Sequence, residues 1–268
     1  CPMAADPTSS LTPEQISRFR ADGFLSIGAL TTPEEVAQIR EIYDRLFEMR
    51  AGWDEGMYHD LAGTEEEGAT EQIPQIMKPA LRKYAPELFE TELLANAVNI
   101  GRQILGDDCL CEVQHAILKP GGGPETPWHQ DAAYMGGGCV LRTFSFWVPL
   151  QPVTVENGCM QFVRGSHQRD VFEHRSMNDN PRIHALELTP EEMGNVVDPV
   201  ACPLPAGGAA LHDSYTLHYA GPNQTDGERR ALILKAQIEP VPTGKPRTFP
   251  WMEAWDTAGM KREKASDT

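Results

Sequence analysis

The first third of the chain has the apolar spacing of amphipathic helices. Thr12, followed by Pro13 and then by a glutamine three positions after the threonine, forms a capping box that opens a helix, and Gly23 is suited to end it. The same pattern recurs at Thr32 and opens a second helix. One face of this second helix carries its apolar side chains, which are Val36, Ile39, Tyr43, Leu46 and Phe47. Residues 24–28, between the two helices, predict a short strand.

Two further segments complete this helical part, which spans about 12–106. Residues 51–73 contain several glycines and an acidic cluster without a regular period, which predicts a long, mobile loop of the kind that serves as a lid. Residues 86–105 have the pattern of another helix, with Gly106 at its end.

From Cys109 onward the chain changes to short β-prone runs separated by Gly, Pro, Asn and Asp. Many short strands with frequent turn signals predict a sandwich or barrel of antiparallel strands. The final dozen residues are polar, and we expect them to be loosely ordered. We therefore expect a single domain over 1–268, with a helical N-terminal part at about 12–106, a β core at about 109–240 and a polar C-terminal extension at 241–268.

The composition limits the classes of protein to which the chain can belong. Its 268 residues include 39 acidic and 23 basic side chains, and the net charge of −16 argues against a nucleic-acid partner. No apolar run is long enough to span a bilayer, so we expect no membrane partner. The six cysteines form no C-x-x-C pair, and the N-terminus lacks the pattern of a secretory signal. These features predict a cytoplasmic protein with reduced thiols, which can be a monomer or a homodimer.

His129 and Asp131 form an H-x-D pair that can chelate a metal ion. In an extended chain, side chains two positions apart project to the same side. A second imidazole would complete the set of two histidines and one carboxylate that non-haem Fe(II) oxygenases use. His218, in a late β-prone segment, is the candidate third ligand, whereas we interpret His212 as a strand-end histidine satisfied by hydrogen bonds. An H-x-D pair by itself is a weak signal, because this spacing often arises by chance.

Three blocks of sequence, in this order, resemble the phytanoyl-CoA dioxygenase (PhyH-like) family. They are WHQD at 128–131, FSFWVPLQPVTVENGCMQFVRGSH at 144–167 and HYAGPNQTDGER at 218–229. The resemblance extends over about 12–240 and implies a mainly β fold. This is a double-stranded β-helix, or cupin-like jelly-roll, with the N-terminal helices packed on one sheet. The resemblance also implies Fe(II) held by His129, Asp131 and His218, with 2-oxoglutarate and O2 as co-substrates and ascorbate as a reductant in assays.

The resemblance also implies which residues bind the oxoacid. Arg229, eleven residues after the distal histidine, occupies the position of the arginine that meets the distal carboxylate of 2-oxoglutarate. A planar guanidinium suits that bidentate contact. Its neighbour Arg230, on the other side of the strand, is the alternative. Trp147 matches an aromatic residue that lines the oxoacid pocket, although an aromatic residue in a strand equally suits the core.

Other family contacts rest on spacing alone. Lys78 and His115 fall where the family places further contacts to the co-substrate, and a solvated helix lysine is the alternative for Lys78. The family often has a serine two residues after the distal histidine, where this chain has Ala220. The remaining histidines lack partners at ligand spacing, and we expect them at the surface or beside the ligands; they are His59, His167, His174 and His184.

The expected reaction is hydroxylation of an unactivated C–H bond in a small organic molecule or secondary metabolite, with release of succinate and CO2. A related halogenating subset replaces the carboxylate ligand with a small residue, so Asp131 favours hydroxylation. The alternatives are a cupin-type metalloenzyme that uses no oxoacid, which Arg229 argues against, and a non-catalytic jelly-roll binding protein. Substrate choice would depend on pocket and lid residues such as Tyr134, Met135, Arg142 and the 51–73 loop.

Overall fold

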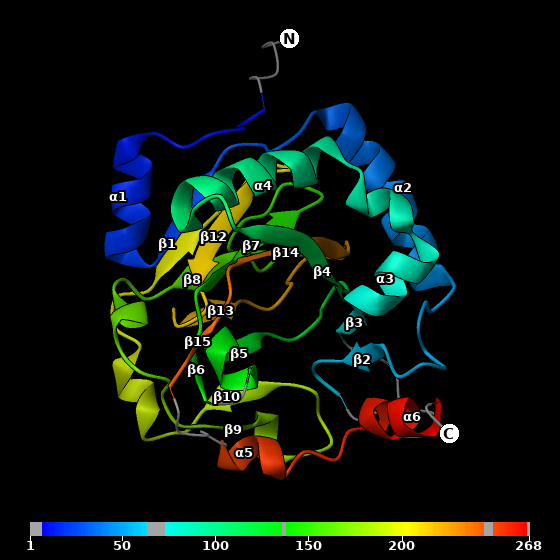
Figure 1. The fold of residues 1–268 in the computed structure, drawn as a ribbon. Coiled ribbons are helices and arrows are strands. Elements are labelled where there is room, and N and C mark those ends of the chain that lie inside the picture. The colour runs from blue at the N-terminus through cyan, green and yellow to red at the C-terminus, as the bar shows by residue number, and fades with distance from the viewer. Residues whose placement is uncertain (1–6, 64–72, 136–137, 244–248, 267–268) are drawn as a thin grey trace.

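Two antiparallel sheets face each other, and helices cover the outer side of the larger sheet (Figure 1). The computed structural model describes residues 7–63, 73–135, 138–243 and 249–266. The strands of the larger sheet, in spatial order, are β1 (Phe24–Ile27), β12 (Ala209–Asp213), β7 (Thr143–Pro149), β14 (Arg229–Gln237), β4 (Leu110–Lys119), β3 (Pro74–Met77) and β2 (Tyr58–Asp60). Those of the smaller sheet are β11 (Val200–Cys202), β8 (Met160–Phe162), β13 (His218–Ala220) and β5 (Thr126–His129). Two short pairs join β10 (Leu186–Leu188) to β9 (His174–Ser176) and β15 (Val241–Pro242) to β6 (Cys139–Val140).

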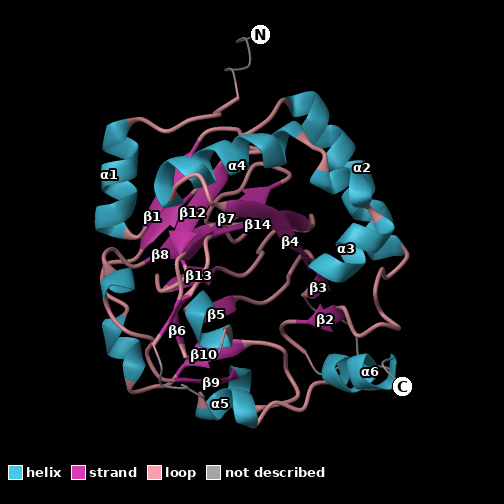
Figure 2. Cartoon of the chain, viewed as in Figure 1, coloured by secondary structure: helices cyan, strands magenta, loops and turns pink. Residues whose placement is uncertain are grey.

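The longest helices lie in the N-terminal part of the chain, and Figure 2 shows the helices in cyan. The α-helices are α1 (Pro13–Asp22), α2 (Pro33–Glu48), α3 (Lys78–Tyr84), α4 (Glu92–Leu105), α5 (Pro250–Glu253) and α6 (Ala258–Ser266). The 3-10 helices are η1 (Pro86–Phe89), η2 (Asp131–Tyr134), η3 (Ser166–Gln168), η4 (Met177–Asp179) and η5 (Glu192–Asn195). None of the described helices is long and apolar enough to cross a membrane.

The predicted start signals of the first two helices are confirmed. The Thr12 side chain accepts a hydrogen bond from the Gln15 backbone N–H, and the Gln15 side chain accepts one from Thr12 N–H, so the capping box is complete. Gly23 ends α1 with a positive φ of 83°, which an L side chain adopts only with strain. Thr32 caps α2 in the same way through the Glu35 N–H.

Alternation along the strands separates two apolar cores. On β7, Phe144, Phe146 and Val148 pack with the helices, while Trp147 belongs to the cluster between the two sheets. The same alternation on β14 sends Leu232, Leu234 and Ala236 to the helices and Ala231 and Ile233 between the sheets. Each core strand of the larger sheet therefore has one face that lines the space between the sheets. The expected jelly-roll core with N-terminal helices packed on one sheet is confirmed.

Three local predictions need correction. The predicted loop at 51–73 includes strand β2, and its residues 64–72 lie outside the described ones. The predicted helix at 86–105 is divided into η1 and α4, because Thr91 caps a new helix by accepting from Leu94 N–H. The C-terminal residues expected to be loose include α6, where Arg262 donates to the backbone oxygens of Trp53 and Tyr58. These contacts fix the helix to the N-terminal part of the chain.

Candidate metal centre

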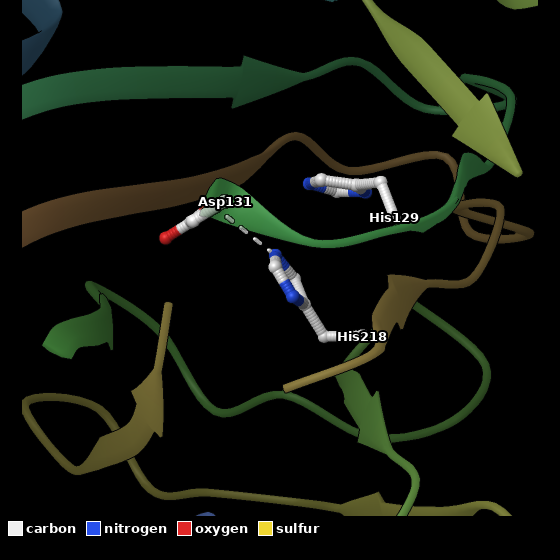
Figure 3. Close-up of side chains that lie close together, drawn as sticks. All are labelled: His129, Asp131 and His218. Atoms are coloured by element: carbon white, nitrogen blue, oxygen red, sulfur yellow. Dashed lines mark ion pairs between the residues drawn. The ribbon is translucent and has the colours of Figure 1, made fainter. Parts of the chain in front are cut away.

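His129, Asp131 and His218 converge at the end of the smaller sheet. Strand β5 ends at His129 and pairs with β13, so that His129 and His218 lie directly opposite each other. The chain stays extended through Gln130, and Asp131 then opens η2. One ligand atom from each of the three side chains lies within 4.8 Å of the others. Figure 3 shows the three side chains close together, with the ion pair between Asp131 and His218 marked.

Backbone contacts set the orientation of both imidazoles. His129 Nδ1 lies 2.7 Å from the Pro127 oxygen, and His218 Nδ1 lies 2.8 Å from the Thr216 oxygen. A carbonyl oxygen can only accept, so each Nδ1 carries the proton and each Nε2 presents a lone pair. His218 Nε2 then faces Asp131 Oδ1 at 3.5 Å, which places two acceptors opposite each other. A cation between them resolves this arrangement, and the donor set therefore fits a metal ion.

The Asp131 carboxylate is held by side chains of the larger sheet. Ser145 donates its hydroxyl proton to Oδ2 at 2.9 Å, and His212 Nε2 lies 3.4 Å from the same oxygen. Ser145 and His212 are paired residues on β7 and β12. Burial alone would raise the pKa of Asp131, but its contacts with His212 and His218 prevail and hold that pKa well below the usual range. The carboxylate is therefore ionised and oriented.

The electrostatics of the site favour a neutral His129 imidazole. Burial, followed by the neighbouring His218, lowers the pKa of His129 to about 3. A neutral ring at pH 7 keeps its lone pair available to a metal ion. Only 4% of the His218 side chain is exposed, against 26% for Asp131, so the site opens on the carboxylate side. Two imidazoles and one carboxylate are the donor set of non-haem Fe(II) oxygenases, in which the remaining coordination positions are free for other ligands.

Arg229 and Trp147 lie deeper between the same two sheets. The Arg229 guanidinium carbon is 5.0 Å from the centre of the Trp147 ring, and both residues are buried. Arg230 points to the opposite side of β14 and donates to Asp44 of α2 at 2.5 Å. Of the two arginines considered from the sequence, only Arg229 therefore faces the space between the sheets.

Lys78 and His115 have different surroundings. Lys78 begins α3, and its ammonium group lies 2.8 Å from Glu112 with about a third of the side chain exposed. His115 lies on β4 opposite Ile233, and burial, followed by Lys235, lowers its pKa to about 4, while Asp131 opposes this shift. His115 is therefore close enough to the candidate metal centre for the charge of Asp131 to act on its pKa. The roles of both residues as co-substrate contacts stay predictions.

The sequence did not single out Ser145, or the contact of His212 with the metal carboxylate. Ser145 stands two positions before Trp147 on β7 and therefore shares its inward face, which was the available signal. Gln130, between the two ligands of β5 and η2, is fully buried. Its backbone N–H donates to His174 Nε2 at 3.1 Å, and its side chain bonds the backbone of Tyr215 and Phe172.

The other histidines are mostly not surface residues. His174 and His59 are buried, which corrects the surface alternative for both. The His59 and His184 rings stack with their centres 4.0 Å apart, and the His184 ring is 5.1 Å from that of Trp255. His167 lies near the Arg20 backbone oxygen at 3.2 Å, away from the metal ligands.

Comparison with known proteins gives consistent matches over most of the chain. A family model described as phytanoyl-CoA dioxygenase (PhyH) matches residues 19–231. A probable alpha-ketoglutarate-dependent hypophosphite dioxygenase of Stutzerimonas stutzeri is 26% identical over 227 residues, which cover 82% of this chain and 77% of that protein. The ectoine dioxygenase of Bordetella bronchiseptica is 26% identical over 241 residues, which cover 84% and 75%.

A solved structure is also similar. The crystal structure of EvdO2 from Micromonospora carbonacea var. aurantiaca, complexed with 2-oxoglutarate, aligns with a TM-score of 0.75 and 34% identity. The alignment covers 92% of this chain and 99% of EvdO2.

Proposed function

The chain belongs to the phytanoyl-CoA dioxygenase family and is an Fe(II)- and 2-oxoglutarate-dependent dioxygenase, and we propose that His129, Asp131 and His218 hold its iron. The observation that supports this assignment most is the convergence of the three ligand atoms, with both Nδ1 protons committed to backbone oxygens. The facing acceptors of His218 and Asp131 need a cation between them.

We propose that the enzyme hydroxylates a C–H bond of a small organic molecule. Bound Fe(II) supplies the oxygen chemistry, in which O2 and 2-oxoglutarate yield succinate, CO2 and one oxygen atom inserted into the substrate. Arg229 binds the distal carboxylate of the oxoacid, and Trp147 supports the guanidinium from one side. Ser145 fixes the carboxylate of Asp131. The presence of Asp131 as a ligand supports hydroxylation over halogenation.

The substrate would approach on the open, carboxylate side of the metal centre. The Tyr134 ring packs edge-on against His129 at 5.7 Å and contacts Trp255 at the same centre-to-centre distance. Lys235 and His115 lie near Asp131 on the larger sheet. Aromatic rings beside a few polar groups are typical of small-molecule sites. The relatives named for hypophosphite and ectoine support a small substrate.

We propose a cytoplasmic enzyme that acts without nucleic acid or a membrane partner. Among the described residues the cysteines Cys109, Cys111, Cys139, Cys159 and Cys202 are free thiols, which supports a reducing compartment. The net charge of −16 supports a partner other than nucleic acid.

A substrate panel read by succinate release tests the proposed function. The panel contains hypophosphite, ectoine and uncharged natural products, and product mass identifies the reaction. We expect Fe(II)- and 2-oxoglutarate-dependent succinate formation, with a product that gains one oxygen. His129→Ala should abolish it, whereas His167→Ala, which alters a histidine away from the ligands, should not. Stoichiometric metal binding without binding or turnover of the oxoacid would instead favour the cupin-type alternative.

A further inference from the structure

A second buried basic side chain lies beside Arg229. Lys119, the last residue of β4, pairs directly with Arg229, the first residue of β14. Lys119 is 0% exposed and Arg229 is 2% exposed. Along β14, Arg229 shares its face with Ala231 and Ile233, which pack between the sheets with Trp147. The two basic side chains therefore lie together on the face of the larger sheet that lines the space between the sheets.

Neither cation has an acidic partner within hydrogen-bond distance among the described residues. Lys119 Nζ donates to the backbone oxygens of Ala220 at 3.2 Å and Gly221 at 2.7 Å. Arg229 donates from one terminal nitrogen to the Gly158 oxygen at 3.2 Å, and its buried Nε has no partner.

The backbone oxygens that accept these bonds are held close together by a glycine contact. Gly158 has a positive φ of 81°, and a Cβ built on it would lie 2.3 Å from the Gly221 oxygen. Only glycine at position 158 allows this close approach of the two chain segments. Their contact therefore holds the backbone oxygens that accept from Lys119 and Arg229 side by side. Donors remain unused on both cations, because lysine has three N–H bonds and arginine five.

Two neighbouring buried basic groups are unfavourable in their charged forms unless an anion completes the site. Burial of a charge without a counter-ion is unfavourable, and the charged forms of the two side chains would also repel each other. The charge of Glu125 acts on Lys119, but the Glu125 carboxylate already accepts a hydrogen bond from Tyr219 at 2.6 Å. A carboxylate has two oxygens and room for about four hydrogen bonds, which suits the free donors of both cations.

We propose that Lys119 is a second anchor for the distal carboxylate of the oxoacid and makes the co-substrate pocket selective for dicarboxylic oxoacids. This inference rests on the proposed function, in which Arg229 binds that carboxylate. The neighbouring Ala220 contributes only a methyl group and a backbone oxygen, so the lysine supplies the additional donor. Lys119 acts by binding the co-substrate, and its two hydrogen bonds to the backbone oxygens of Ala220 and Gly221 fix its amino group in place.

A comparison of two oxoacids separates this role from a structural one. The Fe(II)-loaded protein is titrated without oxygen with 2-oxoglutarate and with 2-oxopentanoate, which has the same chain length but no distal carboxylate. Dissociation constants come from titration calorimetry, so the readout does not depend on turnover. Wild-type protein, Lys119→Met and, as a matched control on the other face of β14, Arg230→Met are compared.

We expect Lys119→Met to raise the Kd for 2-oxoglutarate by about 10–100-fold, the range for loss of a charge-assisted hydrogen bond. The Kd for 2-oxopentanoate should stay within about threefold, and Arg230→Met should change neither. If Lys119→Met does not fold, Lys119→Gln retains an amide that can donate to the backbone oxygens but lacks the charge. An equal loss for both oxoacids, or no loss for 2-oxoglutarate, would overturn the proposal while leaving the proposed function intact. Failure of wild-type protein to bind 2-oxoglutarate would overturn the proposed function itself.

Discussion

Ser145→Ala tests whether the larger sheet controls the metal site through one hydroxyl group. The mutation removes the 2.9 Å hydrogen bond to Asp131 Oδ2 and leaves the three ligands in place. His212 stays 3.4 Å from the same oxygen, so the carboxylate keeps a longer, weaker contact. A hydrogen bond to a charged group contributes about 1.5–3 kcal/mol, which corresponds to about 10–100-fold in a binding constant. The expected loss of Fe(II) affinity therefore lies in that range, as for other partners of metal ligands.

The assay is an anaerobic competition for Fe(II) between the protein and a coloured chelator of known affinity. Thr143→Val is the matched control, because Thr143 lies two residues earlier on β7 and donates its hydroxyl to the Ala236 oxygen at 2.8 Å, not to the metal carboxylate. We expect the control to lose about 1 kcal/mol of unfolding free energy and to bind iron normally. Wild-type iron affinity in Ser145→Ala, or an equal loss of affinity in Thr143→Val, would refute the proposed role of Ser145.

Three further substitutions test other parts of the account. Arg229→Met should raise the KM for 2-oxoglutarate at least about 100-fold in a succinate assay, whereas Arg230→Met should leave this KM unchanged. Equal effects of the two substitutions would be inconsistent with the assigned faces of β14. Gly158→Ala should lower the unfolding free energy by about 1–3 kcal/mol in urea, because of its positive φ and the close Gly221 oxygen; unchanged stability would show that the contact relaxes. Burial, then Arg229, lowers the pKa of Lys119 to about 6, against about 10.4 in the unfolded chain. The stability cost of this lysine is thus complete below pH 6 and vanishes as the pH rises toward 10.4. Without iron or oxoacid, the unfolding free energy of Lys119→Met should therefore exceed that of wild type, by most at low pH. This difference should shrink by about 1.4 kcal/mol per pH unit between the two pKa values. A difference independent of pH in urea titrations would contradict this.

The sequence was sufficient to predict those features that depend on residues close together in the chain. The caps at Thr12 and Thr32 fix the starts of α1 and α2, because the donors and acceptors involved lie within one helical turn. The pairing of His129 with Asp131 follows from extended backbone in the same way. The three sequence blocks then located His218 and the fold through resemblance to a family.

Features that depend on distant chain segments were missed. Lys119 ends a strand and precedes Pro-Gly-Gly, a pattern typical of an exposed lysine, yet it is completely buried and donates to the backbone oxygens of Ala220 and Gly221. His212 was expected to be satisfied by hydrogen bonds, but its buried Nδ1 has no hydrogen-bond partner. The pairing of β12 with β7 places its Nε2 beside the metal carboxylate instead. The C-terminal helix α6 lacks a clear apolar face and is fixed instead by the bonds from Arg262 to the backbone near residues 53–58.

The most direct test of the iron and oxoacid assignment is the visible absorbance that appears when a 2-oxoacid chelates Fe(II). Titration of 2-oxoglutarate into the Fe(II)-loaded protein without oxygen should produce this charge-transfer band with one oxoacid per chain. The band should be absent in His129→Ala and His218→Ala. Iron bound by wild-type protein without any such band would contradict the account.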